Sequence, residues 1–203
     1  YNPFAARETR PGPVSDKVVT LPPRPAEAPA VKPVEEDEAP VVDRWKGIAA
    51  ADSAVAKGLD AITRDDPTFD AKHFLDGARG AYEMIVTAYG EGDRRTLKNL
   101  LARDVYEGFD GVIREREQRG ETAETRFVSI DSTDIAAAEM RGKVAQITLR
   151  FASKLVSVTR NKAGEVIDGN PEKVTDVTDV WTFARDVTSR DPNWKLVATE
   201  TGH

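Results

Sequence analysis

The sequence contains no cysteine and only two histidines among its 203 residues. The absence of cysteine excludes disulfide bonds and thiolate metal sites, and it fits reducing and oxidising compartments alike. His73 falls on the polar edge of a predicted helix and His203 ends the chain, so we expect both side chains to be solvated. Metal-ligand spacings, phosphate-binding loops, dinucleotide-binding motifs and nucleophile elbows are also missing. We therefore predict a non-enzymatic protein with no catalytic residues, no metal and no cofactor.

Long apolar runs are missing as well. The longest are a few residues, whereas a membrane-spanning helix needs about 20. We expect any membrane anchor to lie before Tyr1, outside the given sequence. The formal net charge of −6 argues against a nucleic-acid partner, because neutralising phosphates needs a concentrated basic surface.

Proline is scarce after residue 43, since nine of the twelve prolines fall in residues 1–43. The same segment holds the acidic cluster Glu35–Glu38 and no periodic apolar pattern. A segment that buries no apolar surface cannot offset its loss of chain entropy. We predict that residues 1–43 form a disordered, proline-rich acidic linker that acts as a tether.

Residues 45–64 have the apolar spacing of an amphipathic helix. Its apolar stripe contains Trp45, Ile48, Val55, Leu59 and Ile62, and the cations Lys46, Lys57 and Arg64 gather on one flank. This arrangement suits a helix on an anionic membrane, although Asp52 falls inside the stripe. The helix could equally pack on its own domain, because burial stabilises each large apolar side chain by a similar ~1.5–3 kcal/mol in either environment.

Three further helices are predicted. A long one runs from about residue 70 to 89, capped by Asp70 and ended by Gly90 or Gly92. Gly77 and Gly80 fall inside it, where each costs up to ~1 kcal/mol relative to alanine, so we expect another element to cross closely there. Asp93 caps a short helix, and a helix within residues 104–121 directs Val105, Phe109, Val112 and Ile113 inward.

After Gly120 the apolar period changes to that of strands. Residues 143–155 and 173–187 alternate apolar and polar side chains, residues 160–169 have hairpin-turn composition, and residues 193–200 form a last strand. The sequence "SRDPNW" (189–194) suits a turn between strands, with a recognition loop as the alternative. Helices followed by hairpin-linked strands predict an α+β fold, with amphipathic helices packed on a curved antiparallel sheet.

The motif "DVWTFARDVTSRDPNWKLVATE", together with "FLDGARGAYEMIVTAYGEGDRRTLKNLLARDVYEGFDGVI", resembles the Tim-forty-four-like domain family. This family includes a peripheral subunit of the mitochondrial inner-membrane import translocase and alphaproteobacterial relatives. The resemblance implies a cone-like α+β fold of the nuclear-transport-factor-two-like superfamily, without known catalysis. It divides the chain into the linker 1–43, an amphipathic helix at 44–66 and a Tim-forty-four-like domain at 67–203.

The resemblance also implies membrane attachment, because family members bind cardiolipin-rich inner membranes partly through amphipathic helices and scaffold translocation machinery. On this basis the predicted membrane-binding residues are Trp45, Lys46, Ile48, Val55, Lys57, Leu59, Ile62 and Arg64. The expected partners are anionic, cardiolipin-like lipids and components of protein translocation or envelope assembly. We expect a bacterial inner-membrane protein, peripheral or anchored, on the cytoplasmic side.

Two other functions remain open. Cone folds of this superfamily often enclose a cavity, so one alternative is a pocket protein that binds a lipid tail or small apolar molecule, with or without enzymatic activity. The candidate lining is Phe109, Ile113, Phe151, Trp181 and Phe183. Alternatively, the helix at 45–64 binds another protein in a soluble module.

Overall fold

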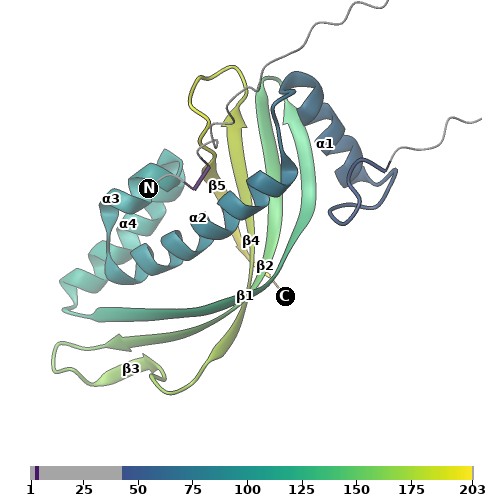
Figure 1. Ribbon diagram of the computed structural model, residues 1–203. Coiled ribbons are helices and arrows are strands. Elements are labelled where there is room, and N and C mark those ends of the chain that lie inside the picture. The colour runs from purple at the N-terminus through teal and green to yellow at the C-terminus, as the bar shows by residue number, and fades with distance from the viewer. Residues whose placement is uncertain (1–2, 5–42, 203) are drawn as a thin grey trace, which may run out of the picture.

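The computed structural model describes residues 3–4 and 43–202 of the chain. The predicted linker at 1–43 therefore lies outside the described residues, except for Pro3, Phe4 and Asp43. The order is four helices followed by five strands (Figure 1). The helices are α1 (Ala54–Asp65), α2 (Ala71–Glu91), α3 (Arg94–Leu100) and α4 (Arg103–Gln118). The strands are β1 (Thr122–Arg141), β2 (Val144–Arg160), β3 (Val166–Gly169), β4 (Thr175–Asp186) and β5 (Lys195–Thr201).

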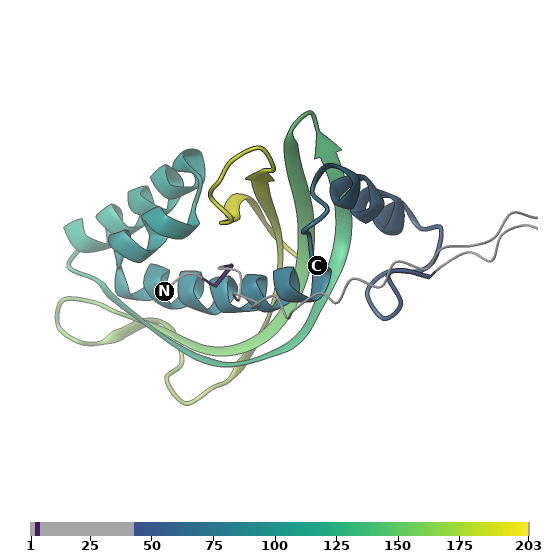
Figure 2. The same cartoon turned by 45° about the horizontal axis from the view of Figure 1, so that its top comes forward.

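The strands form one antiparallel sheet in the order β1-β2-β4-β5, with β3 paired to β2. β1 changes register against β2 at three places, and such bulges bend and twist a strand. The sheet accordingly curves around α2, as Figure 2 shows. The predicted α+β fold with helices on a curved antiparallel sheet is confirmed.

The core lies between α2 and the concave face of the sheet. Alternate residues of β2 point into it, including Ile147, Leu149 and Phe151, and α2 contributes Phe74 and Tyr82. The parallel bridge between Leu101 and Leu196 joins the α3–α4 junction to the β5 edge. One sheet face therefore builds the core while helices cover it.

The helix boundaries follow the predicted caps. Asp70 Oδ1 accepts hydrogen bonds from the backbone nitrogens of Lys72 (3.0 Å) and His73 (3.2 Å), which fixes the start of α2. Gly92 ends α2 with φ of 72°, and Asp93 caps α3 by accepting from the backbone nitrogen of Thr96. These predictions are confirmed.

Two helix predictions are wrong. The first helix begins at Ala54 instead of residue 45, because Gly47 (φ 82°) and Asp52 (φ 59°) adopt left-handed conformations that interrupt a helix, and Ser53 caps the new start. In α4, Val112 is 42% exposed, whereas Ile113 beside it is buried. Adjacent residues of a helix point about 100° apart, so both cannot face the core centrally.

Candidate functional site

A pocket of about 590 Å³ opens between α2, α4 and the sheet. Its apolar walls come from both helices and from the sheet: Ile85, Val86, Tyr89, Phe109, Leu155 and Trp181. Its polar side contains Arg116, Thr125, Ser157, Asp179 and Glu200. Mixed linings of this kind suit small ligands with a mostly apolar body.

Tyr82 connects this pocket to the buried core. Its hydroxyl donates to Asp179 Oδ2 at 2.7 Å and lies 2.8 Å from Ser153 Oγ, which donates to it. Tyr82 and Ser153 are buried, whereas Asp179 is half-buried at the pocket surface. Each member of the triplet has a partner, as buried polar groups require.

Burial shifts two pKa values at this site upward. Burial raises the pKa of Tyr82 well above its ordinary value, opposed by the hydrogen bond from Ser153 and reinforced by Asp179. Burial also raises the pKa of Asp179, and the hydrogen bond from Tyr82 partly offsets that rise. The pocket therefore presents a desolvated carboxyl group beside a protonated phenol.

Arg116 lies at the rim of the pocket but is already engaged. Its Nη2 donates to the backbone oxygen of Tyr89 at 2.7 Å, and its guanidinium lies 5.3 Å from the centroid of the Tyr89 ring. A cation at the last carbonyls of α2 is stabilised by the helix dipole. Arg116 thus holds α4 against the end of α2.

The predicted pocket lining is only partly brought together. Phe109 and Trp181 line the pocket. Ile113, Phe151 and Phe183 do not, because they are 0–1% exposed in the core. Phe151 lies beneath the pocket, stacked on Tyr82 with ring centroids 4.3 Å apart. Tyr82 and Asp179 were not among the predicted site residues, although Asp179 interrupts the apolar alternation of β4, which is a signal visible in the sequence.

The predicted membrane-binding residues separate into two groups. Leu59 and Ile62 are fully buried, Trp45 is 8% exposed, and Ile48 and Val55 pack partly buried on the core. The cations Lys46, Lys57 and Arg64 are exposed. The apolar stripe thus faces the protein and the basic flank faces water.

Close packing holds α1 to β1. A Cβ atom added at Gly58 would lie 1.7 Å from the backbone oxygen of Ala138, so only glycine permits this approach. Trp45 Nε1 donates to Asp60 Oδ1 at 2.9 Å, which joins the preceding turn to the helix. The α1 region is therefore a docked part of the domain in this conformation.

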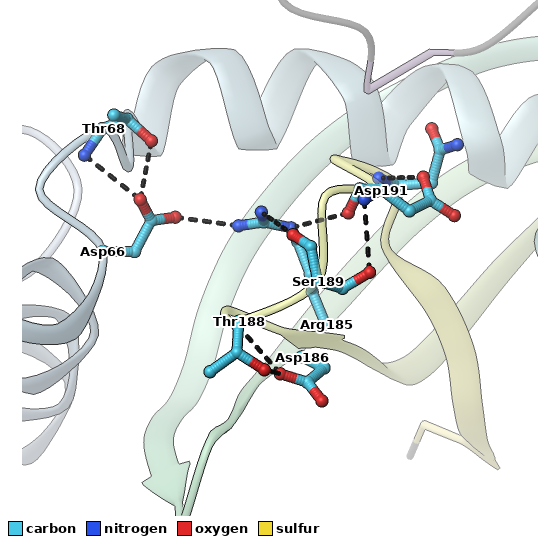
Figure 3. Close-up of polar contacts among 8 residues, drawn as sticks. Asp66, Thr68, Arg185, Asp186, Thr188, Ser189 and Asp191 are labelled. Carbon is cyan, nitrogen blue, oxygen red and sulfur yellow. Dashed lines mark hydrogen bonds and ion pairs between the residues drawn. The ribbon is translucent and has the colours of Figure 1, made fainter.

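Figure 3 shows the polar contacts that hold the β4–β5 loop. Arg185 Nη1 lies 2.8 Å from Asp66 Oδ2, and the two side chains are only 15% and 12% exposed. Arg185 also donates to the backbone oxygens of Asp191 (3.1 Å) and Ser189 (3.4 Å). Asp66 in turn accepts from Thr68. Residues 189–194 lie in the loop between β4 and β5, as predicted, but the turn itself lies earlier, where the Ser189 backbone nitrogen donates to the Asp186 oxygen at 3.1 Å. Arg185 and Asp66 tie this loop to the α1–α2 linker.

Within the described ranges, 3–4 and 43–202, no three acidic or histidine side chains form a possible metal-binding group. Among the same residues, no helix combines the length and hydrophobicity needed to cross a bilayer.

The Tim44-like domain family matches residues 55–201 of this chain. The match begins inside α1 and ends at the last residue of β5, so it starts before the predicted boundary at residue 67. All nine described helices and strands contribute to the matched segment.

Two groups of curated relatives are similar to this chain. The mitochondrial import inner membrane translocase subunits TIM44 of Mus musculus and Homo sapiens are each 30% identical over 142 residues, covering 68% of this chain and 31% of each relative. The Rickettsia prowazekii protein RP434 is 26% identical over 144 residues, covering 71% of this chain and 58% of that protein. The chain therefore spans about a third of the length of the translocase subunits.

Among solved structures, the intermembrane space region of the chloroplast protein ARC6 is similar with a TM-score of 0.44 and 16% identity. That similarity covers 66% of this chain and 98% of the ARC6 region.

Proposed function

Since this chain belongs to the Tim44-like domain family, we propose that it is a non-enzymatic, membrane-associated adaptor for protein translocation or envelope assembly at a bacterial inner membrane. The family match over residues 55–201 carries this proposal, and the names of the TIM44 relatives support it. The Rickettsia relative supports a bacterial setting.

The non-enzymatic part is supported by the chemistry of the pocket. Tyr82, Ser153 and Asp179 satisfy one another, and the lining contains neither histidine nor lysine. His73, the one histidine of the described residues, lies elsewhere, with Nε2 3.4 Å from the backbone oxygen of Phe4. A histidine or lysine general base is therefore missing from this lining.

The α1 region is the proposed contact with anionic lipids. Release of α1 from β1 would expose Trp45, Leu59 and Ile62, and insertion into a bilayer would bury them again. Each such burial is worth ~1.5–3 kcal/mol in either place, so these contributions nearly cancel. The exposed cations then decide the balance, because a Lys or Arg near an anionic bilayer contributes about 1 kcal/mol.

Co-sedimentation of the full chain with cardiolipin-containing and neutral vesicles, across a salt series, tests this proposal. We expect binding to the anionic vesicles that weakens with salt. Replacing Lys46, Lys57 and Arg64 together by glutamine removes about 3 kcal/mol of attraction, or roughly a hundredfold in affinity.

A control variant loses the same number of positive charges outside the α1 region. Lys162, Lys173 and Arg190 are exposed residues outside the α1 region, and their replacement by glutamine should leave most of the binding intact. Equal losses of vesicle binding in the two variants would show that binding depends on net charge alone. Full binding by the α1 variant would rule out the proposed lipid contact.

The pocket favours a second function, binding of a lipid tail or a small apolar molecule. The supporting observation is its volume of about 590 Å³ beside the desolvated Asp179. Titration with a fluorescent fatty-acid analogue tests it. Ala123→Trp, which fills the lining, should weaken binding at least tenfold, whereas the same change at exposed Ala136 on β1 should not. Equal binding by both variants would exclude this pocket.

A further inference from the structure

Pro3 and Phe4 lie against the folded domain, although residues 5–42 separate them from Asp43. Figure 2 shows this short purple segment beside α2. The Phe4 side chain is 4% exposed, and its ring centroid lies 6.1 Å from that of Phe74 on α2 and 6.0 Å from that of Phe183 on β4. An aromatic side chain remote in sequence thus enters the aromatic cluster of the domain.

A groove receives this segment. It is formed by the first half of α2, the α1–α2 linker and the β4–β5 loop, and about 110 Å³ of open space remains beside Phe4. The walls include Phe69, His73, Trp194 and the Asp66–Arg185 ion pair. Each wall is a segment already fixed by contacts within the domain, so the groove does not depend on the chain between residues 5 and 42.

Two glycines of α2 make room for the segment. A Cβ atom at Gly77 would lie 2.7 Å from both Phe4 Cδ1 and the Pro3 backbone oxygen. A Cβ atom at Gly80 would meet only Pro3 Cβ, at 3.3 Å. Glycine inside a helix is destabilising. The close contact with Pro3 and Phe4 explains why glycine is present at both positions. The crossing element predicted at these glycines is this segment.

We propose that this groove is a docking site for a short peptide with a proline followed by an aromatic residue, and that Pro3–Phe4 is its reversible intramolecular occupant. Proline restricts the backbone of the incoming segment and so lowers the entropy cost of ordering it. The aromatic ring fills the cleft between Phe74 and Phe183 and acts as the anchor of the contact. The inference goes beyond the proposed function and does not depend on lipid binding.

The covalent link favours the chain's own segment over a free peptide. The covalent connection raises the effective concentration of this segment at the groove, so a free peptide binds the unchanged chain only in competition with Pro3–Phe4. A Phe4→Ala variant removes the anchor and leaves the groove accessible. Peptide binding in trans is therefore measured on the Phe4→Ala chain.

The probe is a fluorescently labelled synthetic peptide of residues 1–8, and its anisotropy is followed as protein is added. We expect the Phe4→Ala chain to bind it at least tenfold more tightly than the unchanged chain. A probe in which Phe4 is replaced by alanine should lose at least tenfold in affinity for the same protein, because it lacks the anchor.

Two second-site variants locate the contact. Adding Gly77→Ala to Phe4→Ala should abolish peptide binding, since the new methyl group occupies the path of Pro3 and Phe4. Adding Gly108→Ala instead should leave binding unchanged, because a Cβ atom there meets nothing within 4 Å. Both changes remove a helical glycine, so circular dichroism should show folded protein in each case.

Three results would overturn the proposal. Failure of the peptide to bind the folded Phe4→Ala chain would show that the groove has no affinity for such segments. Binding that persists in the Gly77→Ala double variant would locate the contact elsewhere. Loss of folded structure on Phe4→Ala alone would make Phe4 a permanent core residue.

Discussion

Replacing Gly58 by alanine tests how α1 is held. The added Cβ atom would lie 1.7 Å from the backbone oxygen of Ala138 on β1 and 2.5 Å from its carbonyl carbon. Backbone atoms of a paired strand cannot rotate away as a flexible side chain would. The helix itself must therefore move outward by about 1.5 Å or more to reach an ordinary contact distance.

The expected magnitude combines two opposing effects. Overpacking a tight contact costs up to ~3 kcal/mol, and occasionally more where only backbone can yield. Alanine in place of a helical glycine returns about 1 kcal/mol. We expect Gly58→Ala to lower the free energy of unfolding by about 2 kcal/mol. Gly108→Ala, which meets nothing within 4 Å, should raise it by up to ~1 kcal/mol.

Urea denaturation followed by circular dichroism measures both variants, and vesicle co-sedimentation adds the functional readout. If membrane contact requires release of α1, Gly58→Ala should bind cardiolipin-containing vesicles more tightly than the unchanged chain. Gly108→Ala serves as the control and should bind as the unchanged chain does. A neutral or stabilising effect of Gly58→Ala would refute the close packing of α1 on β1. A destabilised variant with unaltered vesicle binding would show instead that lipid contact uses the docked helix.

Two further predictions concern partly buried ionisable groups. Arg185→Ala should lower the free energy of unfolding by about 2 kcal/mol in urea denaturation, because it leaves the partly buried Asp66 carboxylate without its cation. Arg190→Ala in the same loop should change the free energy of unfolding by less than about 0.5 kcal/mol, and similar effects of the two changes would contradict a structural role for the ion pair. The raised pKa of Asp179 means that the folded protein keeps the carboxyl proton to higher pH than the unfolded chain does. The contribution of Asp179 to stability is therefore fully present below the unfolded pKa of about 3.9, and it is lost as pH rises through the folded pKa. Asp179→Asn cannot ionise and still offers an acceptor to Tyr82, so its stability relative to the unchanged chain should increase across this pH range; a pH-independent difference would rule out the shift.

Elements with local signals could be predicted from the sequence. Caps at Asp70 and Asp93 and the stop at Gly92 depend on residues within one helical turn, and their positions are confirmed. The strands β2, β4 and β5 each bury one face, so their apolar alternation is visible. The break between β4 and β5 also has a local signal, because Pro192 lacks the backbone N–H that a strand ladder uses, although the turn itself forms earlier, at residues 186–189.

The first strand was missed, although β1 is the longest in the sheet. Its three changes of register each shift the alternation by a residue, so apolar positions stop recurring at every second place. The inward face of β1 also includes small residues such as Ala138, against which α1 packs closely. The inward-facing residues of such a strand can be recognised only once its partner strand and the helices that cover it are known.

The candidate site was predictable only in part for a similar reason. Trp181 could be placed on the inward face of β4 from alternation alone. Asp179 lies on the same side two residues earlier, and its importance depends on Tyr82, which is on a helix far away in the sequence. Nor could sequence spacing predict which residues would cross Gly77, because Pro3 and Phe4 approach it from beyond a long intervening segment.

The position of β1 after all four helices has a consequence for synthesis on the ribosome. At about 5–20 residues per second, several seconds pass between completion of α1 at Asp65 and completion of the strand that covers it at Arg141. During that interval Leu59 and Ile62 have no sheet to pack against. Each newly made chain therefore passes through a stage in which the stripe of α1 is available to a nearby bilayer before the domain can bury it.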